Sequence, residues 1–531
     1  MKKSLLFILV CIHAMMGYAQ VPTMTWGAEQ KTTDDAGRID RIIGHSDLHV
    51  YAVREYGPTT NKKIELQVFD RANFNLIVSG DINTSGGVMG NSYSSSDVLY
   101  SKTLDKILVT GWAWNKEDQK VTAGVHVVGA TGVWNSNDRI DLIDYRAEKL
   151  LRSGNVEFNL SPDGSKLIVL AELPMDKETN EMIKFACYST SDWSQLWMKD
   201  ITFDTPDANF KRNDVYVDNE GNGYIVKKNK VKLNRYTIQI HSVSASSKTW
   251  AVHDVEMGEN QLGPYRVLQS ENGDMKLYGV TYPDGKTESS PNGTIQAVLD
   301  GGTVVSKRSD FAKDLCTMFM NEKRFLKGKT DIGNTYLRDI KINGKGEAWY
   351  FMEQFSESKL SVEGKPGVYR YARTYKDIIV MKLGSDGSFQ WASAIGREQK
   401  RTYDNIEDDY GHATYALIND EAYVIWNLLN QASSFYAWKT NDGRKMKTNE
   451  VFGSNAVFSI FYSKINASGE NQFTDKVFQS MPFGKFYKSG FNNPSVNIPN
   501  ITYQADNELI LYAELYPTGL RYQMGKMTIT E

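Results

Sequence analysis

The sequence predicts an all-β protein in which one structural unit is repeated eight times around a ring, the architecture of a single eight-bladed β-propeller. Three observations lead to this prediction. One hairpin motif recurs along the whole chain, a second hairpin motif follows it in several units, and no long stretch has helical periodicity. Seven blades are the alternative count, and two stacked β-sandwiches are the alternative architecture.

The first motif is an alternating strand, a turn built from Asp, Asn, Gly or Pro, and a second strand rich in β-branched and aromatic residues. Its turns lie around Asp47, Asp105, Asp163, Glu220, Asn272, Gly344, Asp420 and Asn507. The steps between them are 58, 58, 57, 52, 72, 76 and 87 residues. The repeat is therefore regular in the first half, and we expect enlarged loops in the later blades.

The second motif is a Ser-Asp or Ser-rich turn followed by a tryptophan. SDWSQLWMKDI, which begins at Ser191, matches SDGSFQWASAI, which begins at Ser385, and a shorter copy runs from Ser244 to Trp250. We interpret it as a second hairpin whose aromatic residue packs against the neighbouring unit. Each unit then supplies four strands, as a propeller blade does.

The two ends of the chain predict how the ring closes. The last unit has only three strands after Val496, while Thr23 to Gln30 forms a stray strand-like segment near the start. We expect this N-terminal strand to complete the last blade, because pairing removes an exposed sheet edge.

Residues 1–19 have the features of a secretory signal peptide. They combine Lys2 and Lys3, a short apolar stretch, and a small-residue cleavage site that ends at Ala19. The prediction is a chain exported to the periplasm or the exterior and cleaved after Ala19, with residues 20–531 as the propeller domain. No segment reaches the roughly 20 apolar residues of a transmembrane helix.

Two segments carry a family resemblance. LSPDGSKLIV, from Leu160 to Val169, resembles the first hairpin of TolB-type propeller repeats, and the stretch from Asp377 to Gly396 resembles repeats of other exported bacterial propellers. The resemblance implies the fold and the export route. It implies no catalytic residue, because these motifs are turn and packing features shared by many functions.

Motifs for chemistry are lacking in the sequence. Neither G-x-S-x-G nor H-E-x-x-H occurs, and the formal net charge of −3 gives no basis for nucleic-acid binding. We expect no cofactor other than a possible Ca²⁺ ion. Its candidate ligands are the acidic residues Asp404, Glu407, Asp408 and Asp409, and the alternative is a solvated loop paired with its own basic flank.

A second candidate site is the stretch GVYRYARTY, in which Tyr369, Arg370, Tyr371, Arg373 and Tyr375 alternate aromatic and cationic side chains. Such a surface suits a glycan or a protein ligand. The alternative is an insertion strand packed by its tyrosines. We expect this stretch and the acidic loop up to His412 to share one surface, because insertions in repeat proteins project from one face.

Three functions remain open. The first is a monomeric, non-catalytic binding or scaffolding propeller of the cell envelope or exterior, with a protein or glycan ligand. The second is a glycan-active enzyme whose carboxylates converge at the propeller axis. The third is a subunit of an envelope assembly.

Cys187 lies in the third unit and Cys316 just after the fifth, so an intervening blade should keep their Cα atoms beyond the roughly 7 Å limit for a disulfide. Thiol labelling of the denatured mature protein without reductant should find two free thiols. Labelling of neither would mean that the order of the blades is wrong.

Overall fold

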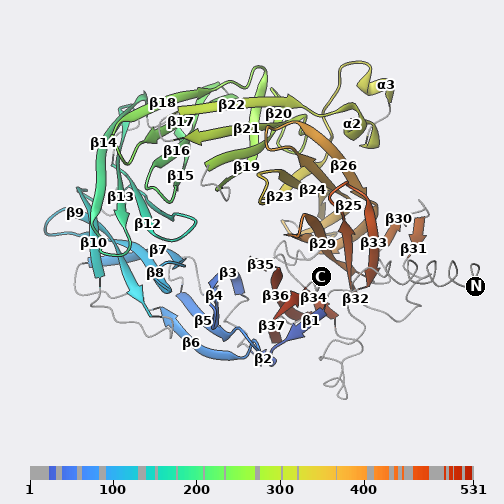
Figure 1. The fold of residues 1–531 in the computed structure, drawn as a ribbon, viewed down its shortest axis with the longest axis horizontal. Coiled ribbons are helices and arrows are strands. Elements are labelled where there is room, and N and C mark those ends of the chain that lie inside the picture. Colours follow the sequence, from blue (N-terminus) through green and yellow to red (C-terminus); the bar gives the residue numbers. More distant parts are fainter. Residues whose placement is uncertain are drawn as a thin grey trace, which may run out of the picture.

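The computed structural model describes the strands and most of their connections. The described residues are 23–31, 39–56, 63–82, 91–129, 139–149, 154–174, 178–206, 210–232, 235–269, 275–300, 303–319, 322–365, 367–403, 412–429, 436–439, 445–447, 458–476, 495–497, 502–505, 507–516 and 521–528. The strands in these ranges form eight antiparallel sheets, which Figure 1 shows as blades around a common axis.

The first five blades are four-stranded sheets. Blade 1 contains β3 (Ile39–His45), β4 (His49–Tyr56), β5 (Lys63–Asp70) and β6 (Leu76–Ile82). Blade 2 contains β7 (Asn91–Ser101), β8 (Lys106–Asn115), β9 (Lys120–Val128) and β10 (Arg139–Arg146). Blade 3 contains β11 (Val156–Leu160), β12 (Lys166–Glu172), β13 (Asn180–Ser189) and β14 (Gln195–Pro206). Blade 4 contains β15 (Phe210–Val217), β16 (Gly223–Lys232), β17 (Arg235–Val243) and β18 (Trp250–Val255). Blade 5 contains β19 (Asn260–Gln269), β20 (Met275–Pro283), β21 (Gly293–Asp300) and β22 (Thr303–Asp310).

The later blades carry additional elements. Two short helices, α2 (Lys313–Phe319) and α3 (Glu322–Phe325), connect blades 5 and 6. Blade 6 contains β23 (Thr335–Ile342), β24 (Ala348–Ser361), β25 (Tyr369–Leu383) and β26 (Phe389–Ile395), with β27 (Arg397–Tyr403), β30 (Tyr436–Lys439) and β31 (Lys445–Lys447) added to its sheet. Blade 7 contains β28 (Ala413–Ile418), β29 (Glu421–Leu429), β32 (Phe458–Ile465) and β33 (Asn471–Lys476). Blade 8 contains β34 (Ser495–Asn497), β35 (Thr502–Ala505), β36 (Glu508–Tyr516) and β37 (Arg521–Thr528), together with β1 (Thr23–Trp26) and β2 (Gln30–Lys31).

The sheets confirm the eight-bladed propeller predicted from the sequence. Each of the eight predicted turns joins the first and second strand of one blade, and the three Ser-Trp motifs join the third and fourth strands. The tryptophans pack across blade boundaries as expected. Trp197 Nε1 of blade 3 donates a hydrogen bond to Gly221 O of blade 4 at 2.8 Å, and Trp391 Nε1 of blade 6 donates one to Ala467 O of blade 7 at 2.9 Å.

Each blade buries its faces against its two neighbours. Eight clusters of buried apolar side chains occur among the described residues, and each cluster joins two consecutive blades. In the last of these contacts, Ile510 and Tyr512 of blade 8 pack with Val50 and Ala52 of blade 1. The core is therefore divided into eight interfaces rather than gathered in one centre.

The N-terminal strand completes blade 8, as predicted. β1 pairs antiparallel with β37, with Thr23 opposite Thr528 and Trp26 opposite Gly525, and β2 continues the pairing at Gln30. Met24 and Trp26 pack against the cluster between blades 7 and 8. The two ends of the described chain thus hold the ring closed, as Figure 1 shows.

Both cysteines of the described chain are free and buried, as expected. Cys187 lies on β13, and Cys316 lies on α2 between blades 5 and 6. Burial raises the pKa of Cys187 to about 12 and that of Cys316 to about 11. Neither α2 nor α3 is long or apolar enough to span a bilayer, and these are the helices in the described ranges.

The topology gives the ring two distinct faces. In every antiparallel blade, the turns after the first and third strands lie on one face. The turns after the second strand and the connections between blades lie on the other, which we call the entry face. The arrangement places α2, α3, β27, β30, β31 and the β24–β25 turn on the entry face.

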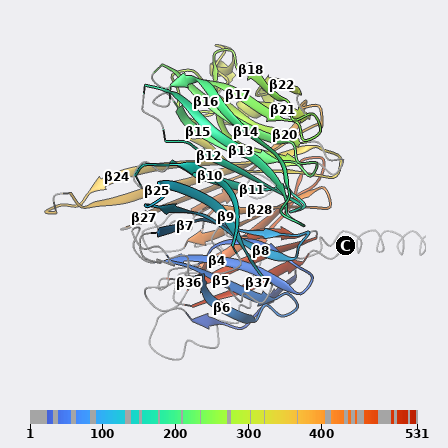
Figure 2. The ribbon, with the colours of Figure 1, turned by 90° about the vertical axis from the view of Figure 1, so that its left-hand side faces the viewer.

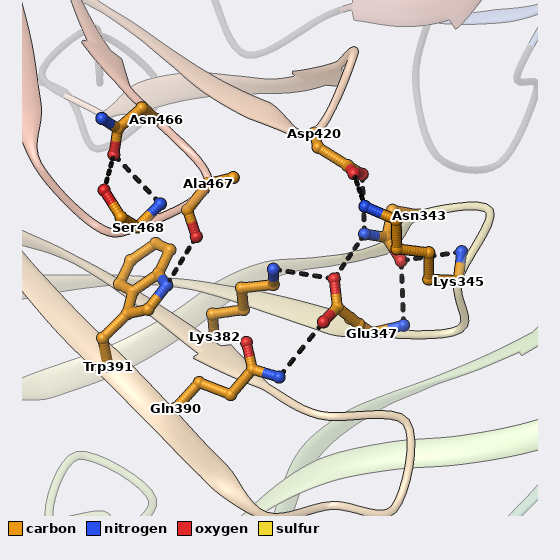
Figure 3. A network of polar contacts seen from close by, with 10 residues as sticks. All are labelled: Asn343, Lys345, Glu347, Lys382, Gln390, Trp391, Asp420, Asn466, Ala467 and Ser468. Carbon is orange, nitrogen blue, oxygen red and sulfur yellow. Dashed lines mark hydrogen bonds and ion pairs between the residues drawn. The ribbon is translucent and has the colours of Figure 1, made fainter.

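On the face opposite the entry face, polar side chains join neighbouring blades. Asn343, in the first turn of blade 6, donates to Asp420 in the equivalent turn of blade 7 at 2.7 Å, and also to Glu347 at 2.8 Å. Lys382 forms an ion pair with Glu347 at 2.7 Å. Figure 3 shows this network beside Trp391. Its donors and acceptors are matched to one another, so it serves to join blades 6 and 7.

Removal of β1 and β2 should weaken the closure of the ring. A chain that begins at Thr32 loses the pairing with β37 and the packing of Met24 and Trp26, so we expect the free energy of unfolding to fall by roughly 3–5 kcal/mol. Urea unfolding measures this loss. The matched control begins at Val21 and should be as stable as the protein that retains both strands, and equal stability of both truncated chains would contradict the role of β1 and β2.

Candidate functional site

Blade 6 extends beyond the ring as an arm. β24 and β25 stay paired from Phe355 opposite Tyr375 to Ser361 opposite Tyr369, and we call residues 355–375 the arm. Figure 2 shows these two strands projecting past the other blades. The turn at the tip is closed by three backbone hydrogen bonds, in which the amide of Val362 donates to Val368 O, that of Lys365 to Val362 O and that of Val368 to Lys365 O.

Insertions from two other places in the chain join the arm. β27, from the connection between blades 6 and 7, pairs with β25 through Tyr371 opposite Tyr403. β30, from the connection between the second and third strands of blade 7, pairs with β27, and β31 pairs with β30. The added strands β27, β30 and β31 therefore form one continuous sheet with the arm.

The arm has two different faces because side chains alternate along a strand. Tyr369, Tyr371, Arg373 and Tyr375 share one face, whereas Arg370 lies on the other face, opposite Leu360. The structure therefore groups four of the five residues predicted from the GVYRYARTY stretch and separates the fifth.

Exposure differs among these residues. Tyr369 and Arg370 are exposed at the tip and Tyr371 is half-buried, whereas Arg373 and Tyr375 are buried. Arg373 Nε donates to Glu357 Oε2 at 2.6 Å. Tyr375 thus has the packing role that the sequence left open as the alternative, and a ligand-binding role of the tip residues stays a prediction.

The proposed calcium ligands Asp404, Glu407, Asp408 and Asp409 lie outside the described residues. In the part of the chain that is described, no group of three or more His, Cys, Asp or Glu side chains is placed to hold a metal ion. A calcium site in this loop stays a prediction. His412, at the end of the same segment, is described and lies at the root of the arm.

A buried carboxylate, Glu353, organises the root of the arm. It lies on β24 with no exposed surface, and it accepts hydrogen bonds from Tyr415 Oη at 2.6 Å and the Ala413 amide at 2.6 Å. His412 Nδ1 lies 2.5 Å from its other oxygen. All three donors come from the start of blade 7, so Glu353 joins the two blades that carry the insertions.

Two arginines surround the same carboxylate. Arg397 Nη2, on β27, lies 3.4 Å from Glu353 Oε1 and has no exposed surface. Arg338 Nε, on β23, lies 3.4 Å from Glu353 Oε2, and the side chain is 23% exposed. Burial by itself would raise the pKa of Glu353, but Arg397, His412 and Arg338 hold the pKa of this carboxyl well below its usual range.

An aromatic cluster covers these charges. The rings of Phe355, Tyr375 and His412 lie 5.1–5.2 Å apart, and Tyr336 lies 6.0 Å from Phe355. The face of the arm that carries Tyr369 and Tyr371 is therefore continuous with the Glu353 site. We call Glu353, Arg338, Arg397, His412 and Tyr415 the root cluster.

The first strands of the blades line the axis, and several meet through polar side chains. The first strands of neighbouring blades lie against one another around the ring. Arg41 of blade 1 pairs with Asp97 of blade 2, and Tyr265 of blade 5 donates to Asp214 of blade 4. Register shifts occur near these positions in β3, β7, β15, β19 and β23. Such bulges redirect side chains, which here form contacts between blades.

Another buried ion pair lies between blades 3 and 4, where Lys227 Nζ is 3.5 Å from Glu181 Oε2. Their side chains are 1% and 3% exposed, so a ligand in solvent cannot reach them. Burial lowers the pKa of Lys227 to about 8, although Glu181 acts in the opposite direction. This pair belongs to the interface of the blades, whereas the root cluster reaches solvent through Arg338.

Sequence reasoning missed Glu353, Arg338 and Arg397 as members of one site. Glu353 lies in the apolar run WYFMEQF, at a position where alternation with Trp349 and Phe351 predicts a buried apolar side chain. A charged residue at such a position is a signal, because a buried charge requires a partner. The partners of Glu353 lie 15 to 62 residues away in the sequence, and no local spacing relates them.

Comparisons with known proteins give neither a family nor an activity for this chain. No family model matches the chain, and no curated protein matches it by sequence. The β-propeller domain of the Trilobed protease from Pyrococcus furiosus has 9% identity and a TM-score of 0.35, covering 82% of this chain and 99% of that chain. The polysaccharide lyase Uly1 has 10% identity and a TM-score of 0.35, covering 95% and 100%. The WD40 domain of SCAP from fission yeast has 9% identity and a TM-score of 0.24, covering 84% and 98%.

With identities of 10% or less and TM-scores of 0.35 or less, these three proteins are no evidence for an activity of this chain. The evidence for the fold is the set of eight sheets. No family model supports the TolB-type resemblance, and the eight sheets show a β-propeller.

Replacement of Glu353 by Gln should destabilise the protein by about 3–5 kcal/mol at pH 7, because it leaves the buried Arg397 without its carboxylate. The pKa of Glu353 is lowered on folding, so its contribution is present above the ordinary value of about 4.5 and is lost as the pH falls below it. Urea unfolding should therefore show a difference between the two proteins that narrows below pH 4.5. Glu363→Gln, at the exposed tip, is the control and should change stability by less than about 0.5 kcal/mol. An equal loss at pH 7 and pH 3.5 would contradict an ionised Glu353.

Proposed function

We propose that this chain is a non-catalytic binding propeller of the cell envelope or the exterior, and that the arm is the part that contacts its ligand. Export rests on the basic start, the short apolar stretch and the cleavage site at Ala19. Binding rests on the arm and the root cluster.

The joined insertions are the observation that carries the proposal. β24–β25, β27 and β30–β31 come from three places in the chain and form one sheet on one face of the ring. A hairpin needed only to connect strands would be two to five residues long. A sheet that projects from a rigid ring is ordered before it meets a ligand, so binding has less conformational entropy to lose.

The tip of the arm has the composition of a contact surface. Leu360, Val368 and Tyr369 are 44%, 47% and 38% exposed, and all three belong to this one hairpin. Lys359 Nζ lies 3.8 Å from the centre of the Tyr369 ring, and Arg370 is exposed nearby. Exposed apolar and aromatic groups beside cations are the side chains that dominate many binding interfaces.

The root cluster favours binding over glycan hydrolysis. A general acid needs a raised pKa so that it keeps its proton near neutral pH. The pKa of Glu353 is lowered by its cations, and the carboxylate has no exposed surface. Glu353 therefore holds neighbouring side chains in place instead of donating a proton.

The test removes the tip surface without removing the arm. A triple variant, Leu360→Ser, Val368→Ser and Tyr369→Ala, keeps every strand pair and should melt within a few degrees of the unmodified protein. We expect it to lose at least tenfold in affinity, measured by surface plasmon resonance against immobilised envelope polysaccharides and envelope proteins.

The matched control carries Val305→Ser and Leu326→Ser, two side chains that are 70% and 74% exposed away from the arm. It should bind as the unmodified protein does. If the tip variant retains full affinity for every ligand of the unmodified protein, the arm is not the binding surface.

A further inference from the structure

Arg338 occupies a special position on the axis-lining strand of blade 6. Along β23, Leu337 pairs with Met352 and Asp339 pairs with Phe351, so Arg338 is the extra residue of a bulge. A bulge redirects the side chain of its extra residue. Arg338 therefore leaves the regular ladder near the entry face, beside the root of the arm.

Neighbouring groups fix the guanidinium of Arg338. Its Nε lies 3.4 Å from Glu353 Oε2, and its Nη2 lies 3.1 Å from His412 Nε2. The centre of the guanidinium lies 5.6 Å from the ring centres of both Tyr336 and Phe355. Its Nη1 contacts no protein partner among the described residues, so one edge of the fork remains available.

His412 acts on Arg338 as a positioning residue. The Glu353 carboxylate can only accept, so His412 Nδ1 carries the hydrogen that faces it. An arginine can only donate, so His412 Nε2 accepts from Arg338 Nη2. The chain from Glu353 through His412 to Arg338 thus sets the orientation of the guanidinium plane.

Among the described residues, cations outnumber carboxylates on the strands around Arg338. The first strands of blades 5 and 6 carry the cations Arg266, Arg338 and Lys341 and a single carboxylate, Asp339. Lys341 already pairs with Asp339 at 3.2 Å, and Arg266 lies 3.9 Å from it with its side chain 56% exposed. Behind these strands Glu353 is matched by Arg397. Among the described residues, β19, β23 and this pair therefore carry four cations and two carboxylates.

We propose that Arg338 binds the carboxylate groups of an acidic polysaccharide that lies along the arm, an inference that rests on the proposed function. A guanidinium fork matches a carboxylate through paired hydrogen bonds. The available Nη1 and the excess of cations over carboxylates favour an anionic ligand. A polymer of uronates supplies one carboxylate on each sugar.

The arm favours a glycan over a peptide. Tyr371 lies on the face of a sheet, where its backbone is already paired with β24 on one side and β27 on the other and offers no hydrogen bonds to a peptide strand. Tyr369 and Tyr371 are two residues apart on one face, a spacing of roughly 6.6 Å along a strand. Flat rings at this repeat suit successive sugar rings.

The experiment uses calorimetry on the full mature chain with three probes. These are an oligogalacturonate of six sugars, the same oligomer with every carboxyl methyl-esterified, and a hexamer of glutamate. We expect the acid oligomer to bind at least tenfold more tightly than its ester and more tightly than the peptide. Arg338→Gln should remove the preference for the acid, and Arg338→Lys should restore part of it.

Controls separate this inference from the proposed function. Arg235→Gln removes a half-exposed arginine of blade 4 and should leave affinity unchanged. The tip variant should weaken the acid and the ester alike, because it removes contact area and not charge. Melting temperatures identify any variant that is not folded.

Four outcomes overturn the inference. Equal binding of acid and ester, or an unchanged preference in Arg338→Gln, would remove Arg338 as the anion site while leaving the arm as a binding surface. Tighter binding of the glutamate hexamer would make the ligand an acidic peptide. Binding of none of the probes would exclude uronates as the ligand.

Discussion

The structure depends on the burial of each blade against the next. A four-stranded sheet has two faces, and the strands here read as apolar on both sides, as in Leu167 to Ala171 of blade 3, which is buried throughout. One blade cannot bury such faces by itself, so each apolar cluster is shared by two neighbours. The ring is free of an exposed sheet edge at its closure only when the last blade is complete. Pairing of β1 with β37 meets that requirement with residues about 500 positions apart in the chain.

The ring leaves little freedom in where a function can be placed. The blade interfaces are close-packed, and the face opposite the entry face is occupied by turns whose polar groups are matched across blades, as at Asn343 and Asp420. Added residues fit only where the chain passes between blades or between second and third strands. The later blades use three such places, all on the entry face. Joining them into one sheet makes a projecting surface without disturbing a single blade interface.

Burial of Glu353 sets the chemistry of that surface. A carboxylate without solvent needs charge and hydrogen bonds in return, and it draws them from β23, β27 and the start of blade 7. Removal of one partner would leave a buried charge unpaired, at a large cost in free energy. This cost holds His412 and Arg338 in place at the root of the arm. Burial and the neighbouring Glu353 raise the pKa of Tyr415 well above its usual value, so this side chain keeps the hydrogen that it donates to Glu353. A surface supported in this way has a fixed geometry without a ligand.

The sequence by itself determined the blades, their order and the closure, because alternation, turn residues and the Ser-Trp motifs are local patterns with a local physical cause. It also indicated the segment from Gly367 to Tyr375 as a candidate binding surface. In the structure, Arg370 lies on the other face of β25 from the tyrosines, and Tyr375 is buried. Only the tertiary structure decided that β27 and β30 extend blade 6 and that Arg338, Glu353, Arg397 and His412 meet. Those contacts join strands from different blades, and a charge surrounded in three dimensions has no signature in the spacing of residues along one chain.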